Sequence, residues 1–307
     1  MAMHSRRDFL KTGTAGLLGS SALLGGTNLF AQTLGLPPGL QLYSVRKELP
    51  NDYAGTLKQV GALGYRQVEA AGYFNHTADE VNKAMRDAGL DLVSAHYPYG
   101  QFQANLDEII EFNKKVGVRY LICASPGFKN PARVKNMKPH DWANAFTMED
   151  WRWNAEQFNQ FGKKVHAAGL TFGYHNHTMA FKKQPNGEVP YIELLKLTDP
   201  SLVTMEMDCG WVVVGGGNPV ELLEHYPTRI SMLHIKDFKF NGQPMSVSNP
   251  PQSAELGRGS IDYRPIFKAA AKTGHIKHAF VEQEQYVDLP TMQALKIDAE
   301  YMIKYHA

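Results

Sequence analysis

The chain has 307 residues, with 32 lysines and arginines against 30 aspartates and glutamates, so its formal net charge at pH 7 is +2. Proteins that hold DNA or RNA by neutralising phosphates need a distinctly basic surface, and this balance argues against a nucleic-acid partner. A chain of this length accommodates either two ordinary domains or one large α/β barrel.

Residues 1–31 have the features of an export signal. Residues 5–11 read SRRDFLK, the pattern of a twin-arginine signal, and a glycine-rich apolar stretch follows up to Phe30. Its glycines disfavour a spanning helix, so we predict no stable membrane anchor. We expect cleavage after Ala31 and delivery of residues 32–307 to the periplasm by the twin-arginine export machinery. Removal of three basic residues and one acidic residue leaves the mature chain formally neutral.

Eight short apolar segments with the length of strands recur along the mature chain. We predict strands at 39–44, 66–70, 91–96, 120–124, 171–175, 202–208, 230–235 and 278–282. Helices are predicted at about 52–63, 77–88, 103–116 and 150–168 after the first four strands, and one after each of the others.

Strands that alternate with helices favour a parallel sheet covered on both faces. We therefore predict a single (β/α)8 TIM barrel over residues 32–307. The rival fold, an open doubly wound sheet, calls for a glycine-rich turn after the first strand, and residues 43–46 contain no glycine. Two long loops, 126–149 and 238–261, are expected to carry function. Cys123 and Cys209 are predicted as buried thiols, although an oxidising compartment permits a disulfide.

Ionisable side chains stand at the carboxyl ends of six predicted strands, where barrel enzymes carry their reacting groups. They are Glu69, His96, His175, His177, Glu206, Asp208, His234, Lys236, Glu282 and Glu284. Burying so many charges in one place is costly unless they share a cation or a polar substrate.

Three of these residues, joined by a histidine from strand five, form a mixed oxygen and nitrogen ligand set. Asp208, His234 and Glu282 with that histidine suit Mn²⁺, Zn²⁺, Co²⁺ or Fe²⁺. Each residue also has a structural interpretation: Asp208 as a helix cap, His234 as a hydrogen-bonded core residue, and Glu282 as the partner of a lysine.

Four phrases resemble the sugar phosphate isomerase/epimerase family with the xylose isomerase-like barrel. They are residues 174–177, YHNH; 207–211, MDCGW; 233–237, LHIKD; and 281–284, VEQE. The resemblance extends from Gln41 to Tyr301. It implies a divalent metal held by strands five to eight, with Asp208, His234 and Glu282 on three ligand positions and a carboxylate nearby that moves protons. Relatives include ketose 3-epimerases, inosose dehydratases, and lyases or hydrolases of 3-keto-glycosides.

Strand five departs from the epimerase pattern. Ketose epimerases of this superfamily usually carry glutamate there, whereas this chain has His175 and His177. We favour His175 as the fourth ligand and His177 as proton carrier or substrate contact, with the reverse left open. The missing glutamate favours lyase or hydrolase chemistry on a 3-keto-glycoside.

The sequence thus predicts an exported, metal-dependent isomerase or epimerase that removes a proton next to a carbonyl of a carbohydrate or polyol. Glu282, His177 and Lys236 are the candidate catalytic residues, with Lys236 either holding an enediolate oxygen or pairing with Glu206. The substrate-binding candidates are His96, Glu69, Trp211 and Arg258, the last within a Gly-x-Gly loop before a helix that Asp262 caps. Alternatives are a 3-keto-glycoside lyase or hydrolase and a non-catalytic sugar-binding protein, and the oligomeric state stays open.

Overall fold

A computed structural model of the chain describes residues 34–242 and 249–306. The predicted export signal, its cleavage site and the domain boundary at Ala31 lie outside the described residues. Within the described ranges, no helix is both long and apolar enough to cross a membrane.

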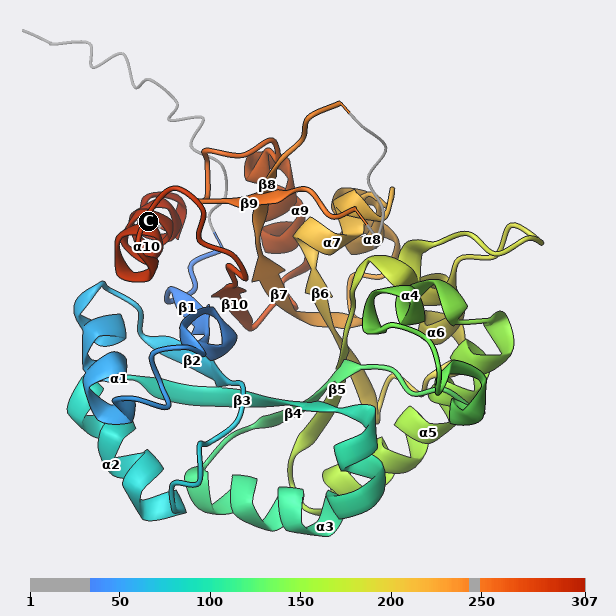
Figure 1. Cartoon of the computed structure of the whole chain (residues 1–307), viewed down its shortest axis with the longest axis horizontal. Coiled ribbons are helices and arrows are strands. Elements are labelled where there is room, and N and C mark those ends of the chain that lie inside the picture. The colour runs from blue at the N-terminus through green and yellow to red at the C-terminus, as the bar shows by residue number, and fades with distance from the viewer. Residues whose placement is uncertain (1–33, 243–248, 307) are drawn as a thin grey trace, which may run out of the picture. The chain divides into compact units, whose positions relative to one another are not determined.

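Eight parallel strands close into a barrel in the order β1-β10-β7-β6-β5-β4-β3-β2, which confirms the predicted fold (Figure 1). The barrel strands are β1 (Gly39–Gln41), β2 (Gln67–Ala70), β3 (Asp91–Pro98), β4 (Tyr120–Ser125), β5 (Thr171–His175), β6 (Val203–Asp208), β7 (Ile230–Ile235) and β10 (His278–Val281). β1 is shorter than predicted because the Gln41 side chain accepts the Tyr43 N–H at 2.9 Å and caps a 3-10 turn, Leu42–Val45.

Helices surround the barrel, and local sequence signals fix several of their ends. They are α1 (Tyr53–Ala62), α2 (Ala78–Ala88), α3 (Tyr99–Val116), α4 (Pro139–Ala145), α5 (Met148–Ala167), α6 (Pro190–Leu197), α7 (Cys209–Val214), α8 (Pro219–His225), α9 (Tyr263–Thr273) and α10 (Thr291–His306). Thr77 and Glu80 form a capping box before α2, and Gly89 ends that helix in the left-handed region. Asp262 caps α9, as predicted.

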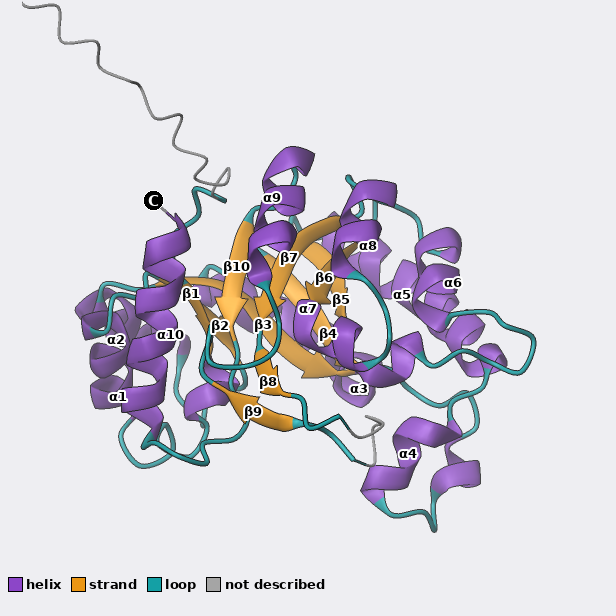
Figure 2. Ribbon diagram, turned by 90° about the horizontal axis from the view of Figure 1, so that it is seen from above, coloured by secondary structure: helices purple, strands orange, loops and turns teal. Residues whose placement is uncertain are grey.

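The two long predicted loops contain ordered elements of their own. A 3-10 turn at Pro131–Val134 and α4 lie in the first, while β8 (Asp237–Lys239) and β9 (Gln252–Ala254) pair antiparallel in the second. Figure 2 shows α4 and the β8–β9 pair on the side toward which the arrowhead of β10 points. Both loops therefore extend over the carboxyl end of the barrel.

The Gly257-Arg258-Gly259 loop is held from within the protein. The Asp237 carboxylate accepts the N–H groups of Gly257, Gly259 and Ile261 at 3.0–3.1 Å. A Cβ on Gly259 would lie 2.1 Å from Asp237 Oδ1, so glycine is needed there for the close approach. An internal carboxylate thus accepts the backbone N–H groups of this Gly-x-Gly loop, where the sequence had predicted substrate binding through Arg258.

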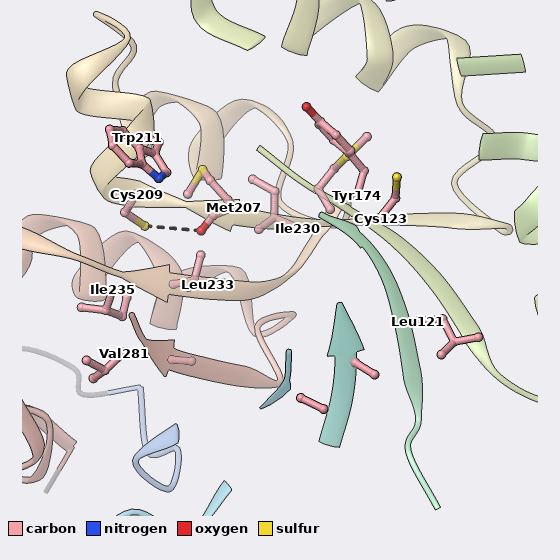
Figure 3. Close-up of a cluster of buried hydrophobic side chains, with 14 of the residues drawn as sticks. Leu121, Cys123, Tyr174, Met207, Cys209, Trp211, Ile230, Leu233, Ile235 and Val281 are labelled. Atoms are coloured by element: carbon pink, nitrogen blue, oxygen red, sulfur yellow. Dashed lines mark hydrogen bonds between the residues drawn. The ribbon is translucent and has the colours of Figure 1, made fainter. Parts of the chain in front are cut away.

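The apolar core has an inner and an outer part. Val93, Ile122, Met232 and Phe280 fill the barrel interior, whereas the larger cluster packs the strands against the helices. Figure 3 shows part of the outer cluster, including Met207, Leu233 and Val281. Gly173 leaves room for the inner residues, because a Cβ there would lie 2.6 Å from Ile122 Cδ1. Cys123 and Cys209 are buried free thiols, as predicted.

We predict that Asp298→Asn stabilises the protein increasingly as pH rises. Asp298 on α10 is buried; its Oδ1 accepts the Leu256 N–H at 2.7 Å and its Oδ2 has no hydrogen-bond partner among the described residues. Burial raises the pKa of this carboxyl from 3.8 to about 8. The protonated carboxyl therefore makes its full contribution to the free energy of unfolding below about pH 4. That contribution is lost between about pH 4 and pH 8, because the unfolded chain gives up this proton at lower pH than the folded protein does.

The asparagine variant keeps the shape of the protonated acid without that loss. Thermal unfolding from pH 4 to pH 8 should show equal melting temperatures near pH 4 and a variant several degrees more stable near pH 8, since in a chain of this size 1 kcal/mol shifts Tm by about 2–4 °C. A constant difference in Tm across the range would show that Asp298 does not titrate in this way.

Candidate active site

A layer of polar side chains, all buried except the partly exposed His96, lies above the inner apolar cluster at the carboxyl ends of the barrel strands. It consists of Glu69 from β2, His96 from β3, His175 from β5, Glu206 and Asp208 from β6, His234 from β7, and Lys236 and Glu282 just after β7 and β10. The structure therefore brings together most of the residues that the sequence placed at one barrel mouth.

Two carboxylates lie deepest in this layer, with His96 between them. His96 Nε2 lies 2.7 Å from Glu69 Oε1 and 2.6 Å from Glu206 Oε2. Gln41 and Ser94 also donate to Glu69, at 2.7 and 2.5 Å. Burial lowers the pKa of His96, but the two carboxylates outweigh it and raise that pKa to about 9, which makes His96 a cation at neutral pH.

His234 spans the layer from its deep side to its mouth side. Its Nε2 lies 2.8 Å from Glu69 Oε1 and 3.3 Å from Glu206 Oε2, and its Nδ1 lies 3.3 Å from Glu282 Oε2. Burial works against a charge on this ring, yet the surrounding carboxylates hold its pKa well above the ordinary value. Because metal ligands must be deprotonated, a cation on the mouth side would replace the Nδ1 proton.

The His175 ring, like the His234 ring, has one nitrogen toward a deep carboxylate and the other toward the mouth side of the layer. Its Nδ1 lies 3.1 Å from Glu206 Oε2, while its Nε2 lies 4.0 Å from Asp208 Oδ2. Burial and the neighbouring His234 lower the pKa of His175, so the ring is neutral and has one N–H and one lone pair. When Glu206 accepts the N–H, the lone pair faces the mouth side.

The mouth side of the layer thus offers a coherent set of metal donors. His175, Asp208, His234 and Glu282 can each place one ligand atom within 4.8 Å of the others. Asp208 Oδ1 accepts the Trp211 N–H at 2.7 Å and caps α7, whereas its Oδ2 has no hydrogen-bond partner in the described part of the chain. Two carboxylates and two imidazoles suit a divalent transition metal.

A second group, with His96 and Glu206 in place of Asp208 and Glu282, also meets this distance limit. His96 is already paired with both deep carboxylates, and Glu206 accepts from His175 and His234 as well. Carboxylates that accept the second N–H of a ligating histidine orient the ring and increase its basicity. We therefore assign Glu69 and Glu206 to the support of the ligands.

Lys236 provides a buried positive charge beside the donor set. Its Nζ lies 2.7 Å from Glu282 Oε2, 2.5 Å from Glu284 Oε1 and 3.3 Å from Asp208 Oδ2. Burial opposes this charge, but the three carboxylates outweigh it and raise the pKa of Lys236. The predicted alternative pairing of Lys236 with Glu206 is wrong, because Lys236 follows the end of β7 and pairs with acids nearer the mouth.

A cavity of about 330 Å³ opens over the donor set. Its lining includes Tyr43, Ala71, Gly72, His96, Tyr97, Pro98, Gln101, Ala124, His175, His177, Glu282 and Glu284. His177 is neutral, because burial lowers its pKa to about 4, and its Nδ1 has no hydrogen-bond partner among the described residues. The cavity therefore combines two of the candidate ligands with a neutral imidazole that can accept or return a proton.

Three predicted substrate contacts lie elsewhere. Glu69 is buried beneath His96 and His234 and does not line the cavity. Trp211 lines a neighbouring cavity that it shares with His177. Arg258 lies in a separate surface pocket, with its guanidinium 4.0 Å from Glu255.

Sequence reasoning missed residues that support or line the site from β1, β3 and the segments that follow these two strands. Gln41 and Ser94 hold Glu69, and Tyr43 and Gln101 line the cavity. Gln41 and Ser94 could have been found, because a polar residue within or at the end of an apolar strand indicates a buried hydrogen-bond partner. Tyr43 and Gln101 carried no such signal.

Known proteins resemble this chain in both sequence and fold. An inosose dehydratase of Clostridium botulinum is 25% identical over 251 residues, covering 76% of this chain and 83% of its own length. The crystal structure of a sugar phosphate isomerase/epimerase from Parabacteroides distasonis matches with a TM-score of 0.69 and 30% identity, covering 87% of this chain and 98% of that one. The zinc-bound structure of the IOLI protein shares the fold, with a TM-score of 0.65 and 12% identity, covering 88% of this chain and 98% of that one.

The family model described as xylose isomerase-like TIM barrel matches residues 57–305. These residues include every strand of the barrel except β1 and all the candidate ligands. The protein is therefore a member of the xylose isomerase-like TIM barrel family.

Proposed function

We propose that the protein is an exported, metal-dependent enzyme that removes a proton next to a carbonyl of a carbohydrate or polyol and then expels a β-substituent. The observation that carries this proposal is the donor set of His175, Asp208, His234 and Glu282 beside Lys236, under a cavity that His177 also lines. The likeness to inosose dehydratases supports an elimination, and the absence of a strand-five glutamate agrees with it.

Residues at different positions in the site have different roles in the proposed reaction. His175, Asp208, His234 and Glu282 would hold a divalent cation, which would supply a Lewis acid for a substrate oxygen. The Lys236 ammonium stabilises negative charge that develops on that oxygen. His177 accepts the proton, because its Nδ1 has no partner, whereas the Glu282 carboxylate is engaged by Lys236 at 2.7 Å and by His234 at 3.3 Å.

A 3-keto-glycoside fits this chemistry. His177 takes the proton from C2, the electron pair forms the C1–C2 double bond, and the C1–O bond to the aglycone breaks. Protonation of the departing oxygen by His177 completes the balance without an external reactant. The same first step followed by return of the proton to the other face would give an epimerase.

We expect the mature protein to contain about one divalent metal ion per chain. Asp208→Asn and His234→Ala should each lose most of it, because removing one ligand breaks the set. Glu284→Gln is the matched control, since Glu284 contacts Lys236 but lies outside the donor set, and it should keep its metal. Elemental analysis of the purified wild type and variants measures the metal content per chain. A folded, active, metal-free protein would contradict the proposal.

Proton removal should be visible as exchange with solvent. Turnover of a 3-keto-glycoside in deuterium oxide should place deuterium at C2 of recovered substrate, and His177→Ala should slow exchange and turnover about 10²–10⁴-fold while the metal content stays the same. Glu282→Gln should instead lose metal and activity together. A second run uses a substrate that carries deuterium at C2 in ordinary water. Movement of that deuterium to the adjacent carbon would indicate a hydride shift and reject this chemistry.

Export is expected to depend on the arginine pair at the start of the chain. Changing Arg6 and Arg7 to lysine should leave the precursor in the cytoplasm, because the twin-arginine route reads both residues. Cell fractionation and immunoblotting of the two forms measure this. Normal periplasmic delivery of the variant would mean that another route exports the protein.

A further inference from the structure

A second cavity of about 270 Å³ adjoins the first at the barrel mouth. Its lining consists of Ser125, Ala143, His177, Thr178, Met179, Trp211 and Pro250. Both long loops contribute to it, Ala143 through α4 and Pro250 through the segment before β9. His177 lines this cavity and the larger one, so a ligand that passes the imidazole would occupy both.

The two cavities differ in chemistry. The first is lined by Glu282, Glu284 and several histidines, whereas no acidic residue, lysine or arginine of the described part of the chain lines the second. A sugar ring placed in the second cavity would leave most of its hydroxyl groups without partners, which is costly. An apolar ring or short hydrocarbon group carries no hydroxyl group that needs a partner, and it gains burial against Trp211 and Met179.

Trp211 is held firmly in this position. Its ring lies 4.8 Å from Lys236 Nζ and 4.9 Å, between centroids, from Phe238. Gly210 permits this packing, because a Cβ on it would lie 2.8 Å from the Lys236 carbonyl oxygen. The Trp211 and His177 rings are 6.2 Å apart, and Trp211 Nε1 and His177 Nδ1 both have no hydrogen-bond partner among the described residues.

We propose that the second cavity binds an apolar aglycone, so that the substrate is a glycoside whose sugar occupies the first cavity. This inference rests on the proposed elimination and specifies its substrate. The bond from C1 to the aglycone oxygen then passes His177, which places one imidazole beside both the C2 proton and the departing oxygen. The aglycone leaves as an alcohol in the apolar cavity.

The test compares the methyl and benzyl 3-keto-glucosides, whose alcohols have similar acidity, so leaving-group chemistry does not favour either. We expect kcat/KM to be about tenfold or more higher for the benzyl compound, since burial of an aromatic ring contributes about that much. Ala143→Phe, which fills the cavity, should bring the ratio close to one. Trp142→Ala removes an exposed aromatic residue of the same helix outside the cavity lining and should keep the wild-type ratio.

Both substrates are measured on the same preparation, so partial misfolding of a variant cancels in the ratio. Met179→Ala provides a second variant, and it should lower the ratio by removing contact area. Equal kcat/KM for the two glycosides in the wild type would overturn the aglycone site while leaving the elimination intact. Turnover of neither glycoside would overturn the proposed function and this inference with it.

Discussion

The buried carboxylates of Glu69 and Glu206 are the constraint on which the site depends. Transfer of an ionised carboxylate into a protein interior costs several kcal/mol unless hydrogen bonds and opposite charges compensate. His96, His234 and His175 surround these two acids, and Gln41 and Ser94 complete the shell of Glu69. That compensation fixes the direction of the two rings that carry the candidate ligand atoms.

The positions of the charged residues on the mouth side depend on these two buried carboxylates. With the imidazoles fixed from below, Asp208 and Glu282 lie opposite their free nitrogens, and Lys236 balances the charge of these acids. Asp208 serves two purposes, because one oxygen caps α7 and the other faces the ligand set. Trp211, whose backbone N–H donates to this cap, lines the second cavity. Helix capping, charge balance and substrate shape are therefore coupled through one residue.

Sequence periodicity was sufficient to predict the barrel, since eight apolar segments separated by helical ones have few alternative arrangements. The same reasoning predicted that charged residues at strand ends would meet, because parallel strands deliver them to one edge. Strand position alone does not separate ligands from supporting acids, because Glu206 and Asp208 stand two residues apart at the end of one strand. The family resemblance favoured Asp208 as the ligand, and the structure adds that Glu206 contacts His96 whereas Asp208 Oδ2 lies near His175 Nε2.

Loop structure was the less predictable part. The first of the two long loops contains a short helix, and the second contains most of a two-stranded ribbon that pairs Asp237 with Ala254 and Lys239 with Gln252, across a stretch longer than a local sequence pattern covers. Arg258 illustrates the same limit. Its glycine neighbours resemble an anion cradle, but Asp237, some twenty residues earlier, already fills that cradle. Local motifs cannot reveal a partner supplied from elsewhere in the fold.

The inner cluster of Val93, Ile122, Met232 and Phe280 closes the barrel beneath the polar layer. The site is therefore a cup with one entrance, and everything that reaches it or leaves it must use the same mouth. A metal ion bound by the four donors would lie beneath any ligand in the cavity above. Loading would then be ordered, with the cation first and the substrate second, and a molecule in the cavity would slow both the entry and the removal of the ion.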